Sequence, residues 1–157
     1  MRRSTLLAGL AALGALRAVP ARAALTLVTH TDAEWRKLLP PQTYWVMRQA
    51  GTEQPFSSPL DEEKRRGTYV CAACALPLFS SKTKFDSGTG WPSFWAPLPG
   101  AIATKSDTSD LMVRTEVHCA RCAGHLGHVF DDGPQPTGLR YCMNGVALNF
   151  RPAADRA

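Results

Sequence analysis

The 157-residue sequence predicts a mainly β fold of antiparallel strands, with short helices confined to its N-terminal third. Helix start and stop signals gather before residue 52. Short β-prone segments separated by Gly- and Pro-rich turns follow residue 67. Two Cys-x-x-C pairs stand beside these segments and indicate that distant strand ends are tied together.

The first 23 residues have the pattern of a secretory signal peptide. Two arginines precede an apolar run over residues 6–16, and a small-residue cleavage pattern ends at Ala23. The run is too short to span a bilayer comfortably. We therefore expect cleavage after Ala23, a single domain in residues 24–157, and no stable membrane anchor after cleavage.

The charge of the chain is concentrated in this signal segment. It holds four of the 18 Lys and Arg residues and none of the 13 Asp and Glu residues, which leaves 14 basic against 13 acidic side chains in the mature chain. Nucleic-acid binding loses its main support, and no nucleic-acid partner is expected. Arg2 and Arg3 partly match a twin-arginine signal. We expect export to a bacterial periplasm by that route or by the general secretory route.

Two short helices are expected at the start of the mature chain. Thr31 and Glu34 form a capping-box pattern, which predicts a helix over residues 32–39 that stops at two prolines. A second helix over residues 41–50 is predicted by its first-turn proline and by Gly51 at its end. The apolar faces of the two helices would come from Trp35, Tyr44, Trp45 and Met47.

Strand patterns begin after a charged segment at residues 57–66, which we expect to be a solvated loop. Residues 68–70 lead into the first cysteine pair as a strand. Residues 141–150 are apolar and β-prone, with a tight turn or bulge expected at Asn144 and Gly145. Period-2 alternation predicts another strand, with one face made of Leu111, Val113, Thr115 and Val117.

Four of the five cysteines form two pairs of the same spacing, Cys71 with Cys74 and Cys119 with Cys122. Two such loops aim four thiolates at one point and close a tetrahedral zinc site. In an exported protein the alternative is a pair of disulfides, but disulfides within Cys-x-x-C loops are small strained rings. We therefore expect one structural zinc ion per chain, because four sulfur ligands leave no open position for catalysis.

The fifth cysteine, Cys142, has no partner and is a candidate reactive thiol. Strand periodicity puts Arg140 on its face, and Asn144 as well if the strand continues that far. A nearby guanidinium favours the nucleophilic thiolate. The alternative is an inert cysteine buried in the core.

His125 and His128 lie three residues apart and would face opposite sides of a regular strand. A bulge at Gly127 would turn both to one side. The four paired cysteines already satisfy one metal ion, so we interpret this pair as proton donors near the reactive thiol. His30 and His118 are expected at the surface.

The aromatic segment over residues 88–95 has two interpretations. It lines the core, or it forms the apolar wall of a small pocket beside the thiol, with Trp91 and Phe94 as the substrate-binding candidates.

Taken together, these motifs resemble the type B methionine sulfoxide reductases. The cysteine pairs and the segments 84–94, 124–134 and 140–144 occur in the family's order, and the resemblance covers roughly residues 31–150. It implies two small antiparallel sheets in a β-tent-like arrangement with peripheral helices. It also implies a zinc ion on the four paired cysteines.

By this resemblance, Cys142 attacks the sulfur of methionine-R-sulfoxide, in oxidised proteins or peptides and in the free amino acid. The products would be methionine and a cysteine sulfenic acid, as suits protein repair under oxidative stress. The resemblance implies that Trp91 holds the terminal methyl group of the substrate. The other implied site residues are His125, His128 and Asn144 at the sulfoxide oxygen, Arg140 at the thiolate, and Asp132 as a residue that orients its neighbours.

The sequence departs from the family at Thr89, where many members carry a resolving cysteine. No sixth cysteine replaces it. We therefore expect an external thiol, such as a thioredoxin-like donor, to reduce Cys142 through a mixed disulfide. The protein is expected to act as a monomer.

Two other function classes remain open from the sequence. One is a non-enzymatic zinc module that holds a ligand in an aromatic cage, and the other is a thiol–disulfide oxidoreductase that uses a Cys-x-x-C pair. Neither class requires Cys142 or the two histidines.

Overall fold

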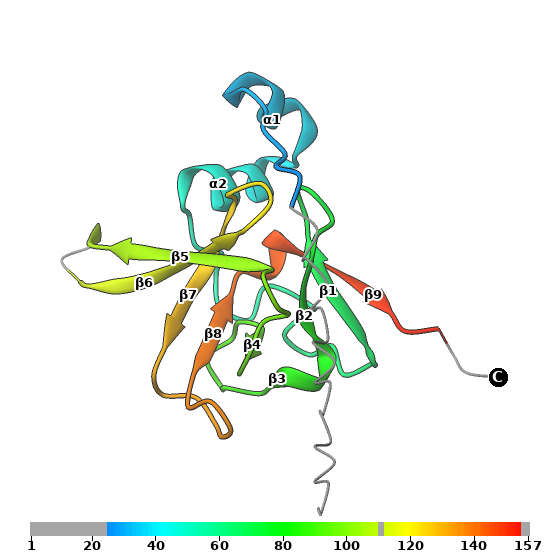
Figure 1. Cartoon of the computed structure of the whole chain (residues 1–157), viewed down its shortest axis with the longest axis vertical. Helices are drawn as coiled ribbons and strands as arrows, with labels where there is room; N and C mark the ends of the chain where they lie inside the picture. The colour runs from blue at the N-terminus through cyan, green and yellow to red at the C-terminus, as the bar shows by residue number, and fades with distance from the viewer. Residues whose placement is uncertain (1–24, 110–111, 155–157) are drawn as a thin grey trace, which may run out of the picture.

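Two antiparallel sheets and two short helices make up the described residues, 25–109 and 112–154, of this computed structural model (Figure 1). The predicted mainly β fold is confirmed, while the expected signal peptide lies outside the described residues. Within the described residues, neither helix has the length and apolar character to cross a membrane. The strands are β1 (Gly67–Cys71), β2 (Pro77–Ser80), β3 (Lys84–Phe85), β4 (Ser93–Phe94), β5 (Ile102–Asp107), β6 (Arg114–Cys119), β7 (His125–Phe130), β8 (Arg140–Met143) and β9 (Leu148–Pro152).

Helix α1 (Asp32–Leu38) begins at the predicted capping box. The Thr31 hydroxyl oxygen accepts a hydrogen bond from the Glu34 backbone N–H at 3.3 Å. The Glu34 carboxylate accepts in return from the Thr31 backbone N–H at 2.7 Å. These bonds satisfy N–H groups that have no partner within the first helical turn.

Helix α2 (Pro41–Gln49) begins with the predicted proline but ends differently from the prediction. Ala50, and not Gly51, takes the left-handed conformation, with a φ of 53°. Gly51 is required for close packing, because a Cβ at this position would lie 2.5 Å from the ring of Trp45. Trp45 is 45% exposed, whereas the other three residues expected on the apolar faces are buried: Trp35, Tyr44 and Met47.

The larger sheet has the strand order β3-β4-β8-β7-β6-β5, and the smaller sheet has the order β2-β1-β9. Every pairing is antiparallel. The β5–β6 hairpin extends to one side of the molecule, the smaller sheet lies on the other, and the helices cover one end (Figure 1). The order places β8, from late in the chain, between the early strand β4 and strand β7.

Aromatic side chains join the two sheets. Phe94 of the larger sheet is fully buried, and its ring stacks on Phe79 of β2 with the ring centres 4.4 Å apart. It also meets the ring of Tyr69 of β1 edge-on, at 4.9 Å. Both partners belong to the smaller sheet, so one buried ring from the larger sheet and two from the smaller sheet form a common core.

Strand β6 is shorter than the strand predicted over residues 111–118. Val117 is fully buried, as predicted, but Val113 is 84% exposed, and Leu111 lies outside the described residues. Glu116, which the predicted alternation places on the face opposite Val117, is also buried. The start of β6 belongs to a hairpin that projects beyond the core (Figure 1), so only its second half has an interior to face.

Replacing Phe94 by alanine is expected to lower the free energy of unfolding by about 3–5 kcal/mol, the usual cost of removing a large buried ring. Urea denaturation followed by circular dichroism measures this change. The matched control is Val113→Ala, at a side chain that is 84% exposed, and its effect should stay below about 0.5 kcal/mol. Similar effects of the two variants would contradict the place of Phe94 in the core.

Candidate active site and metal centre

Two cysteine hairpins with the same backbone geometry follow strands β1 and β6. In the first, the Ala75 N–H donates to the Cys71 carbonyl at 2.8 Å. In the second, the Ala123 N–H donates to the Cys119 carbonyl at 2.9 Å. Both alanines are left-handed, with φ values of 60° and 55°. The same turn therefore presents each pair of sulfur atoms.

The four paired cysteines bring their sulfur atoms within 4.8 Å of one another. The Sγ atoms of Cys71 and Cys122 are 3.6 Å apart, as are those of Cys74 and Cys119. A tetrahedron with zinc–sulfur bonds of about 2.3 Å has sulfur atoms about 3.8 Å apart, whereas a disulfide bond is about 2.05 Å long. The cluster therefore has the dimensions of a tetrathiolate metal site, and none of its four cysteines forms a disulfide.

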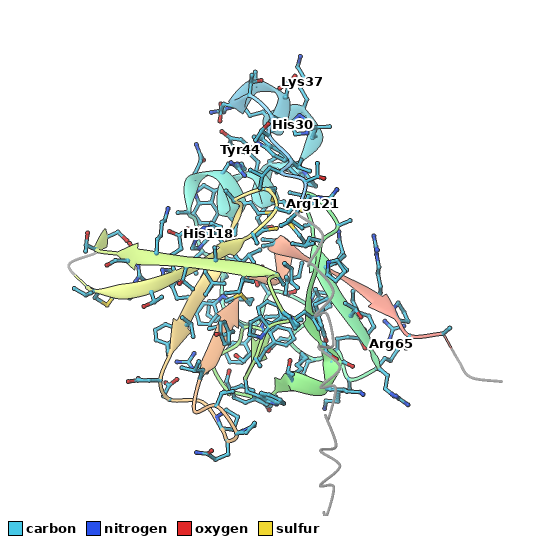
Figure 2. All side chains as sticks on the ribbon, viewed as in Figure 1. His30, Lys37, Tyr44, Arg65, His118 and Arg121 are labelled. Atoms are coloured by element: carbon cyan, nitrogen blue, oxygen red, sulfur yellow. The ribbon has the colours of Figure 1, made fainter. Side chains whose placement is uncertain are left out.

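The metal cluster joins the two sheets. Cys71 ends β1 of the smaller sheet, and Cys119 ends β6 of the larger sheet. Arg121, labelled in Figure 2, adds a bond between the hairpins, because its Nη1 donates to the Cys74 carbonyl at 3.2 Å. A metal ion held here would fix the sheets relative to each other, as the sequence predicted for distant strand ends.

Cys142 lies in a row of side chains that crosses the larger sheet. It is paired with Ser93 of β4 on one side and with His128 of β7 on the other. His128 is paired with Glu116 of β6, which is paired with Lys105 of β5. Directly paired residues of antiparallel strands project to the same face. The row therefore places a thiol, an imidazole, a carboxylate and an ammonium group side by side.

The Cys142 thiol is half-buried, and the Thr89 hydroxyl oxygen lies 3.8 Å from its sulfur atom. Burial raises the pKa of this thiol, while the Thr89 hydrogen bond and the charge of Arg140 act to lower it. Arg140 and Cys142 occupy alternate positions of β8 and so share a face, as predicted. Since the thiolate is the nucleophile, these two contacts oppose the effect of burial.

Arg140 is held in place by Asp132. Its Nε and Nη2 both donate to the Asp132 carboxylate at 2.8 Å, and its guanidinium carbon lies 4.4 Å from the centre of the Phe130 ring. The hydrogen bonds between the two charged groups raise the pKa of Arg140 and lower the pKa of Asp132. The pair borders a hollow of about 390 Å³ that Thr89 also lines.

His125 and His128 come together through a bulge in β7. The pairing of β7 with β6 slips by one residue between His125 and Gly127. This slip is the predicted bulge, and it leaves the two ring centres 5.4 Å apart. Gly127 is required here because a Cβ would lie 2.1 Å from the Cys142 carbonyl oxygen.

Each histidine has a carboxylate partner that the sequence patterns did not indicate. His125 Nδ1 lies 2.9 Å from Glu116 Oε1. His128 Nε2 lies 2.7 Å from Asp107 Oδ2. Nε2 of His125 is buried and has no hydrogen-bond partner among the described residues. The four side chains border one hollow of about 540 Å³. The only local signal for Glu116 was its position, as a charged residue, within a segment of alternating strand pattern.

The charges of this cluster follow from burial and pairing. Burial lowers the pKa of His125, against the raising effect of its bond to Glu116. Burial alone would raise the pKa of Glu116, but bonds from His125 and from Lys105, whose Nζ lies 3.0 Å away, lower it. The pKa of Asp107 is lowered, first by the Ser109 backbone N–H. These directions describe a neutral His125 between ionised carboxylates at neutral pH.

Asn144 is buried, and its amide binds backbone groups on both sides. Its side-chain oxygen accepts from the Glu53 backbone N–H at 2.8 Å. Its side-chain nitrogen donates to the Leu126 carbonyl at 3.1 Å. The amide therefore ties the end of β8 to β7 and to the segment after α2. One of its two N–H hydrogens remains for a ligand.

Glu53 is a second buried carboxylate that the sequence patterns did not indicate. Its side chain accepts from the backbone N–H groups of Gly145 at 2.6 Å and Val146 at 2.9 Å. Its carbonyl oxygen accepts from the Trp91 indole N–H at 3.1 Å. Burial raises the pKa of the Glu53 carboxyl group, partly offset by the two N–H groups. One residue thus holds both the Trp91 ring and the turn after Cys142.

The two predicted substrate-binding aromatics differ in position. Trp91 is half-buried, which leaves part of its ring open to a ligand. Phe94 is fully buried and is paired with Tyr141. Because successive strand residues face opposite sides, its ring points away from the face that carries Cys142. Its place in a pocket wall is therefore corrected to the core between the sheets.

The remaining histidines are labelled in Figure 2. His30 is exposed, as predicted, with its ring 4.6 Å from that of Trp35. His118 was also expected at the surface but is half-buried, and its Nδ1 is buried without a hydrogen-bond partner among the described residues. Burial lowers its pKa.

Comparison with known proteins gives a consistent set of matches. The SelR domain family matches residues 39–152. Three relatives carry the name "Peptide methionine sulfoxide reductase MsrB". The relative from Pseudomonas putida (strain W619) is 58% identical, over 80% of this chain and 95% of its own. The relative from Agrobacterium fabrum is 54% identical, over 80% and 93%. The relative from Methanosarcina barkeri is 56% identical, over 79% and 88%.

Among solved structures, the Mis18 "Yippee-like" domain overlaps with a TM-score of 0.48 and 16% sequence identity, over 58% of this chain and 100% of that domain. An overlap of this size supports no argument about fold or function.

Removing the metal is expected to destabilise the whole domain, because the cluster ties one sheet to the other. Elemental analysis should find one ion per chain, and a chelator that extracts it should lower the midpoint of thermal unfolding. Cys74→Ser should lose the ion, while Cys142→Ser, outside the cluster, should keep it. A full metal content in Cys74→Ser would contradict the four-cysteine site.

Proposed function

The chain belongs to the SelR family of type B methionine sulfoxide reductases, oxidoreductases that act as peptide-methionine (R)-S-oxide reductases, and we propose that Cys142 is its nucleophile. The Cys142 sulfur attacks the sulfoxide sulfur and forms a sulfur–sulfur bond. The oxygen then moves to Cys142 as the substrate's sulfur–oxygen bond and the new sulfur–sulfur bond break, which leaves methionine and a sulfenic acid on Cys142. Methionine sulfoxide is reduced to methionine and Cys142 is oxidised to the sulfenic acid. The thiol proton leaves to solvent before the attack, and the proton on the sulfenic oxygen comes from the histidine pair.

The row of paired side chains across the larger sheet is the observation that carries this proposal. This row places Cys142 directly beside His128. Cys142 is also the one cysteine outside the four-sulfur cluster. A nucleophile and an acid within one strand pair satisfy the basic geometry of the reaction.

Proton delivery is assigned to the histidine pair. A sulfoxide sulfur accepts a thiolate only when its oxygen is polarised or protonated. Glu116 holds Nδ1 of His125, so a protonated His125 would donate from its unpartnered Nε2. Asp107 holds His128 in place through Nε2. Burial makes the imidazolium of His125 a stronger acid, because it lowers its pKa.

The other site residues position the reactants. The charge of Arg140, held by Asp132, acts to lower the pKa of the Cys142 thiol. The exposed part of the Trp91 ring would hold the terminal methyl group of the substrate. Asn144 would support the oxygen site with its remaining N–H hydrogen and keep the end of β8 in place.

The ion in the four-cysteine cluster is proposed to be zinc. An all-thiolate, four-coordinate site suits zinc and leaves no open position for a substrate. When bound, zinc would supply stability to the fold and no chemistry to the reaction.

Cys142 is proposed to be recycled by an external thiol. Thr89 lies next to its sulfur, and the other four cysteines belong to the metal cluster. A thiol of a thioredoxin-like protein would displace water from the sulfenic acid and form a mixed disulfide. A second thiol of the donor would then release Cys142.

Export of a monomeric enzyme to the bacterial periplasm, for repair of oxidised proteins and of free methionine sulfoxide, completes the proposal. Its support is the signal-peptide pattern of residues 1–23. Mass spectrometry of the mature protein from cell fractions tests it, because cleavage after Ala23 predicts the mass of residues 24–157.

Cys142→Ser is expected to abolish reduction of the R epimer of methionine sulfoxide with dithiothreitol as reductant, because it removes the nucleophile. Chromatography of each epimer measures this. The wild-type protein, treated with R-epimer substrate and a sulfenic-acid trapping reagent, should carry the adduct at Cys142. R-epimer turnover by the serine variant, or a Cys142 intramolecular disulfide as main product, would refute the mechanism.

Glu116→Gln is expected to lower kcat at neutral pH by about 100-fold, the lower end of the usual range for general acid–base catalysis. Glu116 raises the pKa of His125, so its removal should move the limb of the kcat–pH profile that reports the protonated histidine to lower pH. A uniform loss of kcat with an unshifted profile would contradict this role. Glu62→Gln, in the charged loop, is the matched control.

A further inference from the structure

Three hydroxyl groups form a chain that ends on the Cys142 sulfur atom. Thr89 Oγ1 lies 3.8 Å from Cys142 Sγ. Ser87 Oγ lies 2.8 Å from Thr89 Oγ1 and 2.7 Å from Ser93 Oγ. Ser93 is itself paired with Cys142 across strands β4 and β8. The row of hydroxyl groups therefore starts at the Cys142 sulfur atom and returns to Ser93, the residue that pairs with Cys142.

Backbone contacts hold Thr89 in this place. The Gly88 N–H donates to the Asp86 carboxylate at 2.9 Å. The Gly90 carbonyl accepts from the Phe56 N–H at 2.7 Å. Both glycines are left-handed, with φ values of 68° and 86°. The position of the Thr89 hydroxyl is thus set by its own loop and does not depend on contact with the sulfur atom.

The protonation state of Cys142 decides the direction of the hydroxyl chain. With a neutral thiol, the S–H donates to Thr89 and each hydroxyl donates to the next. The last donation then goes from Ser93 to the Trp91 carbonyl, 3.1 Å away. With a thiolate, all three hydroxyls turn, and the last donation goes from Thr89 to the sulfur atom. A hydroxyl both donates and accepts, so the chain satisfies either state.

We propose that Thr89 is a further catalytic residue: its hydroxyl, backed by Ser87 and Ser93, donates to the Cys142 thiolate and increases the fraction of the nucleophile that is ionised. The proton that leaves the thiol passes to solvent, and no hydroxyl is itself ionised. This inference rests on the proposed role of Cys142 as the nucleophile.

Arg140 alone stabilises the Cys142 thiolate only in part, and the hydroxyl chain adds to this stabilisation. Two N–H groups of Arg140 already donate to Asp132, so the charge near the thiol is largely compensated. Burial raises the pKa of Cys142, and the Thr89 hydrogen bond is the largest of the contacts that lower it. A hydrogen bond to an ionised acceptor is stronger than one to a neutral acceptor, so the chain stabilises the thiolate more than the thiol.

In the part of the chain that the structure describes, few charged or titratable groups face Cys142. Its own strand contributes Arg140 with its partner Asp132, and β7 contributes His128 with its partner Asp107. Strand β4 contributes Ser93, which does not titrate. A change at Thr89 leaves all of these groups in place, so a difference between two pH profiles isolates the hydroxyl.

The test is the pH dependence of Cys142 alkylation by iodoacetamide in the metal-containing protein, followed by intact mass and peptide mapping. Thr89→Val keeps the side-chain shape and removes the hydroxyl. It is expected to raise the alkylation pKa by about one unit, which slows alkylation about tenfold below that pKa. Ser87→Ala should shift the profile in the same direction by less. Thr89→Ser should restore the wild-type profile.

Thr104→Val, at an exposed position of β5, is the matched control and should leave the alkylation profile unchanged. An unshifted profile for Thr89→Val overturns the inference, as does a Thr89→Ser profile displaced like that of the valine variant. If Thr89→Val does not fold, an unshifted Ser87→Ala profile overturns it. Alkylation needs no turnover, so these results are independent of the Cys142→Ser assay that decides the proposed function.

Discussion

The close approach of strands β7 and β8 at Gly127 is the constraint on which the site depends. A Cβ at this position would lie 2.1 Å from the Cys142 carbonyl oxygen, so only glycine allows the strands to pair here. The pairing sets His128 directly beside Cys142, and the bulge that begins at Gly127 turns His125 to the same side. The carboxylates follow, because Glu116 and Asp107 are placed by the register of β6 and β5 relative to β7. The loss of this one contact would separate the thiol from every proton donor proposed for it.

Two further connections hold this arrangement in the rest of the molecule. A metal ion held by the four-cysteine cluster would fix β1 of the smaller sheet to β6 of the larger one. Glu53 binds the turn after Cys142 through its carboxylate and the Trp91 ring through its carbonyl. A buried carboxyl group with a raised pKa lowers stability relative to an exposed one, so Glu53 fixes the backbone near Cys142 at some cost in stability. Both connections act on the backbone around the reactants and not on the reactants themselves.

The local part of this structure could be predicted from the sequence, because short-range chemistry determines it. The capping box at Thr31, the two cysteine hairpins, the shared face of Arg140 and Cys142, and the bulge at Gly127 all follow from residues close in the chain. The rest depends on strand register and packing. Glu116 was not recognised as a site residue because period-2 alternation does not reveal which neighbour lies opposite, and Glu53 stands in a loop without any motif. Phe94 was placed in a pocket wall because an aromatic segment does not show which of its rings fill the core.

The half-buried position of Cys142 places two opposing demands on the site. Exclusion of water strengthens the electrostatic interactions that deliver a proton to the sulfoxide oxygen. It also raises the pKa of the Cys142 thiol, so a smaller fraction of Cys142 is thiolate. A second fixed cation would solve the latter problem only until the reaction occurs, because its charge would remain when the sulfur atom becomes a neutral sulfenic acid. Hydroxyl groups differ in that they turn. The Thr89 chain donates to a thiolate, and it accepts from a neutral thiol or a sulfenic O–H without leaving a buried charge unpaired. A threonine at this position therefore suits a cysteine whose charge must appear before the reaction and disappear during it.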